Sequence, residues 1–133
     1  MHPTPLDSWH RIVKARDLRA LDALLDDDAV FHSPVVHTPQ VGKAKVTLYL
    51  SAALTLLGTD AFRYVREVVG ERDAVLEFMT EIDGITIDGV DMIRWNDEGR
   101  IVDFKVMIRP LKAIETIHRK MGELLASRMR PDT

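Results

Sequence analysis

The segment from Gly89 to Arg109 limits the possible folds more than any other part of the chain. It reads GVDMIRWNDEGRIVDFKVMIR, so two runs rich in Val, Ile, Phe and Trp flank the turn sequence NDEG. β-Branched and aromatic residues suit a pleated sheet, and Gly99 can adopt the positive φ that a tight turn needs. The segment therefore predicts a β-hairpin.

Asp91 is the unusual residue of this hairpin. Side chains two residues apart in a strand share a face, so Asp91 is predicted to face the same way as Ile93 and Trp95. Burying a carboxylate there is costly unless it is paired or protonated. Two interpretations stay open. Asp91 either bonds to backbone or a helix side chain as a structural group, or it lines a cavity as a hydrogen-bond donor or a general acid or base.

The remaining elements predict a single α+β domain over residues 1–133, with residues 1–5 as a loose lead-in. Apolar residues at helical spacing predict two short helices after residue 6, a central helix over residues 43–57 and a last helix after Pro110. Strands are predicted over residues 29–33, 62–69 and 74–82, followed by the hairpin. Tight turns between consecutive strands predict an antiparallel meander, with the helices on one face. The acidic run at residues 26–28 is interpreted as a solvated loop rather than a metal site, because adjacent side chains diverge.

Composition excludes several functions. The net charge of −3 and the pI of about 5.9 give no reason to expect nucleic acid or a membrane as partner. Without cysteine there is no disulfide, thiolate nucleophile or Cys-ligated zinc. No signal segment or long apolar run is present, so we expect a cytoplasmic protein. Two histidines without a firmly spaced carboxylate are a weak metal signal, and there is no phosphate-binding glycine-rich motif or Rossmann fingerprint, so we expect no metal and no cofactor.

The alternation in the later strands separates two sheet faces. The apolar sets should face the helices, and they are Leu76, Phe78, Thr80 and Ile82 in one strand and Val102, Phe104, Val106 and Ile108 in the last. The opposite face mixes Val and Met with charges of both signs. This outer face is interpreted as a homodimer interface, and a solvated sheet face is the alternative.

Other candidate site residues are less specific. His32 and His37 flank a proline-rich loop, and His32 is a candidate for proton transfer, although alternation places it opposite Phe31 and Ser33. Ser33 has no GxSxG context, so we do not expect a hydrolase nucleophile. Trp9, Tyr49 and Trp95 are aromatics that either pack in the core or stack on a ligand.

Taken together, these motifs resemble the nuclear transport factor 2-like superfamily, and specifically its SnoaL-like branch. The resemblance is carried by LDALLDDDAVFHSPVVHTPQVGKA, AVLEF, GVDMIRWNDEGRIVDFKV and RPL, and it extends from about Trp9 over nearly the whole chain. It implies a cone-shaped, cystatin-like fold, in which three helices pack into a strongly bent antiparallel sheet. It also implies a dimer through the outer sheet face.

In the ketosteroid isomerases of this superfamily, three positions carry the reaction. The resemblance places Ser33 where those enzymes have an aspartate base, Trp9 where they have a tyrosine, and Asp91 at their protonated aspartate. One of the three roles is therefore retained.

The first functional hypothesis is a dimeric pocket protein of unassigned activity that binds an apolar small molecule. Its ligand would contact Asp91 and a set that also includes Trp9, Ser33, Tyr49, Leu76, Phe78, Trp95, Phe104, Val106 and Ile108. The second is a cyclase or isomerase of a carbonyl compound, with Asp91 and His32 as catalytic residues. The third is a non-catalytic interaction module whose cone is filled by its own side chains.

Overall fold

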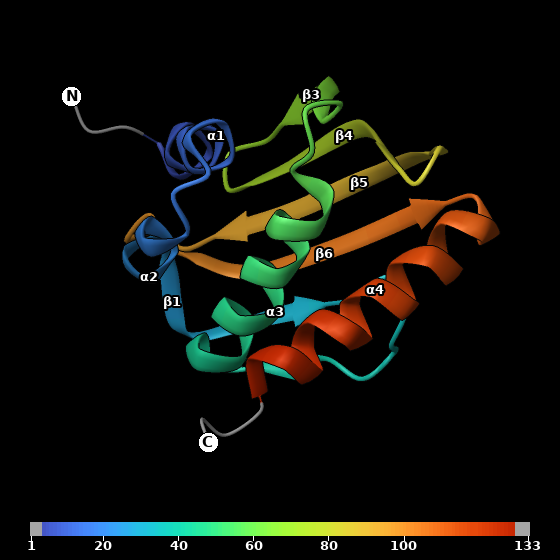
Figure 1. The fold of residues 1–133 in the computed structure, drawn as a ribbon. Helices are drawn as coiled ribbons and strands as arrows, with labels where there is room; N and C mark the ends of the chain where they lie inside the picture. Colours follow the sequence, from blue (N-terminus) through green and yellow to red (C-terminus); the bar gives the residue numbers. More distant parts are fainter. Residues whose placement is uncertain (1–3, 130–133) are drawn as a thin grey trace.

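Six strands form one curved sheet that does not close into a barrel, and the helices pack on one side of it (Figure 1). The computed structural model describes residues 4–129. The helical elements are α1 (Pro5–Ala15), the 3₁₀ turn η1 (Leu18–Ala20), α2 (Leu21–Leu24), α3 (Lys43–Leu57) and α4 (Leu111–Met129). The strands are β1 (Leu25–His32), β2 (Gln40–Val41), β3 (Arg63–Val69), β4 (Asp73–Ile82), β5 (Ile85–Trp95) and β6 (Ile101–Arg109).

The sheet has the strand order β2-β1-β6-β5-β4-β3. The predicted antiparallel meander is confirmed for β3 to β6, and the predicted hairpin is β5 and β6. β1 lies parallel to β6, and the short β2 adds an antiparallel edge strand within a segment that was predicted to be a loop. The register places Asp91 at the centre of the sheet, directly between Leu76 of β4 and Val106 of β6.

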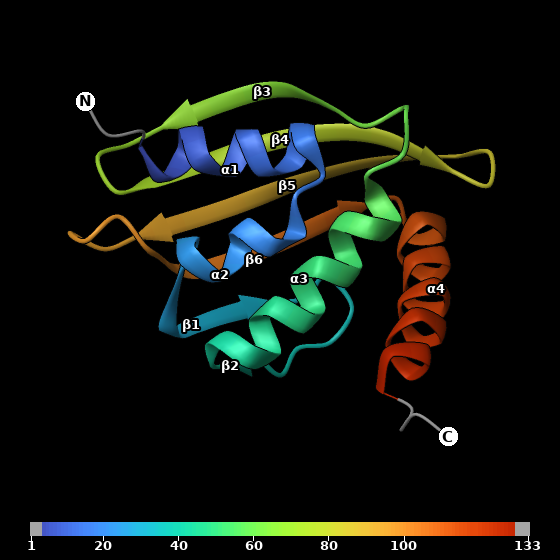
Figure 2. The ribbon, with the colours of Figure 1, turned by 60° about the vertical axis from the view of Figure 1, so that its left-hand side comes forward.

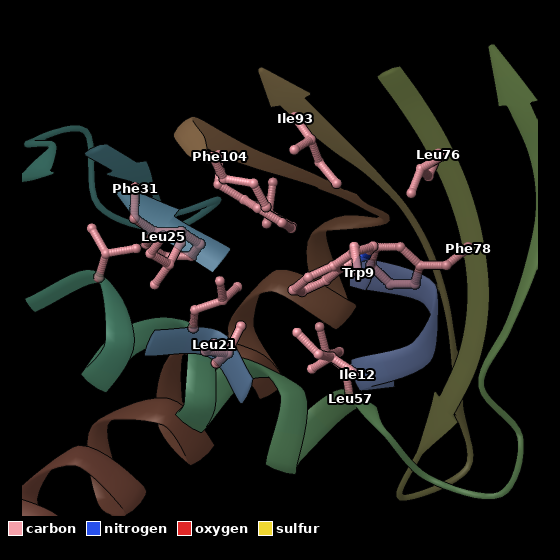
Figure 3. Close-up of a cluster of buried hydrophobic side chains, with 14 of the residues drawn as sticks. Trp9, Ile12, Leu21, Leu25, Phe31, Leu57, Leu76, Phe78, Ile93 and Phe104 are labelled. Carbon is pink, nitrogen blue, oxygen red and sulfur yellow. The ribbon is translucent and has the colours of Figure 1, made fainter. Parts of the chain in front are cut away.

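The core lies between the sheet and the helices, which cover the same face (Figure 2). Trp9 of α1 is directed at the sheet, where it packs near Phe78 and Phe104 (Figure 3). Leu57 of α3 belongs to the same buried cluster and lies near Ile12 of α1. The faces predicted for β4 are confirmed, since Leu76 and Phe78 are fully buried. The outer face exposes large apolar side chains, namely Val68, Val75, Met92 and Met107.

The first helix begins earlier than the sequence suggested. Thr4 is its N-cap: the Thr4 hydroxyl accepts a hydrogen bond from the Asp7 backbone N–H, and the Asp7 carboxylate accepts one from the Thr4 N–H. This capping box satisfies two backbone donors, and Pro5 fits the first turn because its missing N–H is not needed there. Thr4 therefore caps the helix and Pro5 begins it, and residues 1–3 of the predicted loose lead-in lie outside the described residues.

The acidic run at residues 26–28 was predicted to be a loop, and this prediction is wrong. These residues belong to β1, whose buried side chains are Leu25, Ala29 and Phe31. The register with β6 shifts between Leu25 and Val30, so the acidic stretch is an irregularity within the strand. Asp26 is fixed there because its carboxylate accepts hydrogen bonds from the Asn96 side chain and the Asp28 backbone N–H.

No helix within residues 4–129 is long and apolar enough to cross a lipid bilayer.

Candidate functional site

Three side chains from three elements form a hydrogen-bonded row on the inner face of the sheet. Trp9 of α1 donates from its indole Nε1 to the Tyr64 hydroxyl of β3 over 2.9 Å. Tyr64 in turn donates from this hydroxyl to Oδ2 of Asp91 on β5 over 2.6 Å. The indole N–H of Trp9 and the hydroxyl of Tyr64 thus both donate hydrogen bonds within this row. Trp9 and Asp91 are buried.

The sheet register accounts for how Tyr64 reaches Asp91. Tyr64 lies opposite Phe78, and Phe78 lies opposite Gly89, two residues before Asp91. The Phe78 ring covers Gly89 so closely that a Cβ at this position would collide with it. Glycine thus lets the ring lie flat over β5. Tyr64, which meets the Phe78 ring edge-on, then extends across β4 toward the Asp91 carboxyl.

Burial raises the pKa of both titratable groups in this row, Asp91 and Tyr64. It raises the pKa of the Asp91 carboxyl from its ordinary value of 3.8 to about 7, while the hydrogen bond from Tyr64 acts in the opposite direction. The pKa of the Tyr64 hydroxyl is also raised, first by burial and then by the neighbouring Asp91 charge. Tyr64 therefore remains a proton donor at neutral pH, and Asp91 exchanges its proton close to neutrality.

A cavity of about 290 Å³ adjoins this row. Among the described residues that line it, Asp91 is the single carboxyl and Arg16 the single cation. Most of the lining is apolar, and it comprises Trp9, Ile12, Val13, Leu18, Leu50, Ala53, Leu54, Leu57, Phe62, Phe78, Phe104 and Val106, together with Thr55, Gly58 and Tyr64.

One oxygen of Asp91 is open to this cavity. Oδ2 accepts the Tyr64 hydrogen bond, whereas Oδ1 has no partner within residues 4–129. Every fully buried side-chain nitrogen and oxygen of the described residues does have a partner, so Oδ1 must reach the open space. When protonated, this carboxyl can donate a hydrogen bond to an acceptor in the cavity, and when ionised it can accept a proton or a hydrogen bond.

The candidate ligand-binding residues divide between two cavities. Trp9, Phe78, Asp91, Phe104 and Val106 line the first. A second cavity of about 200 Å³ lies between α3, α4 and the ends of β1 and β6, and it is lined by Ser33, Tyr49, Val106 and Ile108 among others. Leu76 is fully buried and Trp95 packs against the core, but neither lines one of these two cavities.

His32 does not meet Asp91. Its Nε2 lies 2.8 Å from Oδ1 of Asp103, and it points away from the side to which Phe31 belongs. Ser33, in contrast, turns inward, and its Oγ accepts hydrogen bonds from the backbone N–H groups of Val35 and Val36. Within residues 4–129 no three His, Asp or Glu side chains gather where a metal ion could bind.

Tyr64 is the member of the site that sequence reasoning missed. It lies in a strand that was predicted nearly correctly, between Arg63 and Val65, both of which are exposed. In the sequence, a tyrosine next to the charged Arg63 in a predicted strand is the signal that could have indicated an inward-facing aromatic residue with a hydrogen-bonding hydroxyl. Its two partners, however, lie 55 and 27 residues away in the chain, and only the assembled sheet brings them together.

Comparisons with known proteins agree with this architecture. The sequence model of the SnoaL-like domain matches residues 6–104. No curated protein matches the chain. Among solved structures, a steroid delta-isomerase from Pseudomonas aeruginosa is 41% identical with a TM-score of 0.89, and the match covers 94% of this chain and 91% of that one.

Two further structures share the fold. An uncharacterised protein with a cystatin-like fold from Silicibacter pomeroyi is 29% identical with a TM-score of 0.83, and the match covers 92% of this chain and 85% of that one. A Mycobacterium tuberculosis protein, solved in complex with estradiol-17β-hemisuccinate, is 21% identical with a TM-score of 0.61 over 83% of this chain and 97% of that one. At this identity the second likeness concerns the fold alone.

Proposed function

The chain belongs to the SnoaL-like branch of the nuclear transport factor 2-like superfamily, and on that premise we propose that it binds a small, largely apolar molecule in the cavity beside Asp91. One observation carries the proposal: the described residues around an apolar cavity include a single carboxyl, and one oxygen of that carboxyl is open to the cavity. A pocket of this kind favours a ligand with an apolar body and one polar group at a defined place.

The polar group of the ligand is a carbonyl or a hydroxyl. Below about pH 7 the protonated Asp91 donates a hydrogen bond to a carbonyl oxygen, and above it the carboxylate accepts one from a hydroxyl. Trp9 and Tyr64 hold Oδ2 in place, so that Oδ1 is oriented before the ligand arrives. Since the surrounding walls are apolar, a ligand that left Oδ1 unpaired would bind less tightly.

A second candidate function is the isomerisation of a double bond next to a carbonyl group. Two observations favour it: the 41% identical Pseudomonas aeruginosa protein is named a steroid delta-isomerase, and the pKa of Asp91 near 7 suits a group that takes and returns a proton. Ser33 cannot serve as the base, and His32 lies on the other side of its strand. In this proposal Asp91 is the proton-transfer group.

Binding of a matched ligand pair tests the first proposal. 2-Acetylnaphthalene and 2-ethylnaphthalene have similar shapes, but only the first carries a carbonyl oxygen. We expect the ketone to bind about 5- to 30-fold more tightly at pH 6, because one well-placed hydrogen bond contributes about 1–2 kcal/mol. Quenching of tryptophan fluorescence reports binding, since Trp9 lines the cavity.

Variants of Asp91 test whether its carboxyl causes the preference for the ketone. Asp91→Leu should abolish the preference for the ketone, while Asp91→Asn keeps a donor and should retain a preference that no longer depends on pH. Glu71→Gln, an exposed change in the turn between β3 and β4, is the control. Equal affinity for both ligands in the wild-type protein would refute the proposal.

Turnover tests the isomerase separately. A β,γ-unsaturated ketosteroid is incubated with the protein, and the conjugated product is followed by its ultraviolet absorbance. Asp91→Asn should remove any turnover, because an amide does not exchange a proton in this pH range. Turnover that is unchanged in this variant would end the catalytic role of Asp91.

We also propose that the chain is a homodimer through the outer sheet face. Val68, Val75 and Met92 lie opposite one another on β3, β4 and β5, and they form an exposed apolar row that ends at Lys105. The next row along the strands pairs Arg66 with Glu77 at 3.2 Å. Apolar side chains next to paired charges are typical of an interface between subunits.

A further inference from the structure

The cavity beside Asp91 adjoins a surface hollow at the end of α1. This hollow is lined by residues of the C-terminal half of α1 and of the loop at residues 58–62. This loop joins α3 to β3 (Figure 2). Five residues line both this hollow and the cavity: Val13, Arg16, Gly58, Phe62 and Tyr64. The hollow therefore adjoins the cavity along these five residues, and it is called the mouth below.

The mouth is positively charged, although the chain as a whole carries a net charge of −3. Lys14, Arg16 and Arg63 line it, and Asp60 is the one carboxylate among the described residues of its lining. Within the part of the chain that the structure describes, neither Lys14 nor Arg63 forms an ion pair. His10 also lines the hollow, but it is paired with Glu67.

Arg16 is the cation closest to the cavity, since it lines both spaces. It is the C-cap of α1, with φ 55° and ψ 37°, and its backbone N–H donates to the Ile12 carbonyl. Helices commonly end on a residue in this left-handed conformation, and glycine adopts it most easily. Here the position carries a long cationic side chain instead, at the edge of the opening.

The present partner of Arg16 can be exchanged. One guanidinium nitrogen lies 3.3 Å from Oδ1 of Asp60, and both side chains are exposed. An exposed ion pair of this kind contributes little to stability, so an anion from a ligand can replace Asp60 at small cost. An anion inside the cavity, by contrast, would lose its water among apolar walls and approach the Asp91 carboxyl.

We propose that the ligand carries an anionic group at its outer end, where Arg16 and Arg63 bind it. This inference rests on the proposed binding function and specifies its ligand class: an apolar body with a hydroxyl or carbonyl group for Asp91 at one end and a carboxylate or sulfate at the other. The two polar ends fix the direction in which the ligand enters.

Estradiol-17β-hemisuccinate and its methyl ester are the probes, since they differ only in whether the outer end is charged. We expect the acid to bind about three- to tenfold more tightly than the ester at low ionic strength, because a charge-assisted hydrogen bond at a solvent-exposed site contributes modestly. The advantage should shrink as salt is added, because salt screens exposed charges.

One double variant and one control variant complete the test. The double substitution Arg16→Gln with Arg63→Gln should remove most of the preference for the acid over the ester, and Lys14 accounts for any small remainder. Arg119→Gln on α4, an exposed arginine that lines neither cavity, should leave the preference unchanged. Equal binding of acid and ester to the wild-type protein, or a preference that the double substitution leaves undiminished, overturns the inference.

2-Acetylnaphthalene separates this result from the proposed function. If it binds while the acid shows no advantage, the anionic mouth is refuted and the cavity proposal stands. If neither it nor the ester binds, the proposed function fails and the inference fails with it.

Discussion

Asp91 makes the stability of this protein depend on pH in a direction that is opposite to that of an ordinary acidic residue. The pKa of its carboxyl is raised from 3.8 to about 7 in the folded chain. Below about pH 4 the carboxyl is protonated in both the folded and the unfolded state, and it has no effect. Between these values the unfolded chain has released a proton that the folded chain retains, so the free energy of unfolding falls as the pH rises.

The magnitude follows from the same two values. Each pH unit between them lowers the free energy of unfolding by about 1.4 kcal/mol, and the interval spans about three units. Above about pH 7 both states are ionised, and the loss stays constant at about 4 kcal/mol. This is a large part of the 5–15 kcal/mol that is typical of a domain, as an order of magnitude.

Asp91→Asn isolates this effect. The amide has the size of the carboxyl, its oxygen can accept the Tyr64 hydrogen bond, and it does not ionise. The difference in free energy of unfolding between variant and wild type should therefore grow by about 4 kcal/mol in favour of the variant between about pH 4 and pH 8. Because only this change with pH is used, a constant offset between the two proteins does not matter.

Urea unfolding at fixed protein concentration measures it, with circular dichroism and tryptophan fluorescence as probes. Fixed concentration is needed because dimerisation would add to the apparent stability. Glu71→Gln removes an exposed carboxyl, and its difference from the wild type should change little with pH. Parallel curves for Asp91→Asn and the wild type would show that the Asp91 carboxyl ionises normally in the folded protein, and they would refute the reasoning.

Three other predictions concern the supports of the site and the outer face. Tyr64→Phe removes the hydrogen bond that lowers the pKa of Asp91, so the same pH series should show the transition above pH 7 and a stability about 1–3 kcal/mol lower at every pH. Gly89→Ala should cost about 1–3 kcal/mol in urea unfolding because its Cβ meets the Phe78 ring, whereas Gly122→Ala, in an open part of α4, should raise stability by up to about 1 kcal/mol. Met92→Lys should convert the proposed dimer to a monomer in multi-angle light scattering, and a monomeric wild type at micromolar concentration would remove the dimer proposal.

The burial of Asp91 could be predicted because it depends on local pattern. A strand alternates with a period of two residues, and a tight turn fixes the register of a hairpin, so the face of Asp91 follows from its neighbours. The structure bears this out, since Asp91 is buried on the same face as Ile93 and is paired with the buried Leu76 and Val106. The alternation holds less well at the end of the strand, where the register with β6 shifts between Arg94 and Trp95.

Features that depend on distant pairing could not be predicted in this way. The acidic run in β1 looks like a loop by composition, and only the parallel pairing with β6 and the burial of Ala29 and Phe31 make it a strand. The role of Tyr64 depends on α1 lying across β3 and on the register of β3 with β4. Similarly, Ser33 and Asp91 both face inward, but they line separate cavities on either side of Val106.

The cost of Asp91 at neutral pH bears on why a carboxyl is present. An asparagine could accept the Tyr64 hydrogen bond without lowering stability above pH 4, so the row from Trp9 to Asp91 does not itself require an ionisable group. What asparagine cannot do is change its charge or transfer a proton near pH 7. A ligand carbonyl raises the pKa of Asp91 because it stabilises the protonated form, whereas a ligand hydroxyl lowers it because it stabilises the carboxylate. The direction in which a bound ligand moves this pKa therefore distinguishes the two ligand chemistries at the same oxygen.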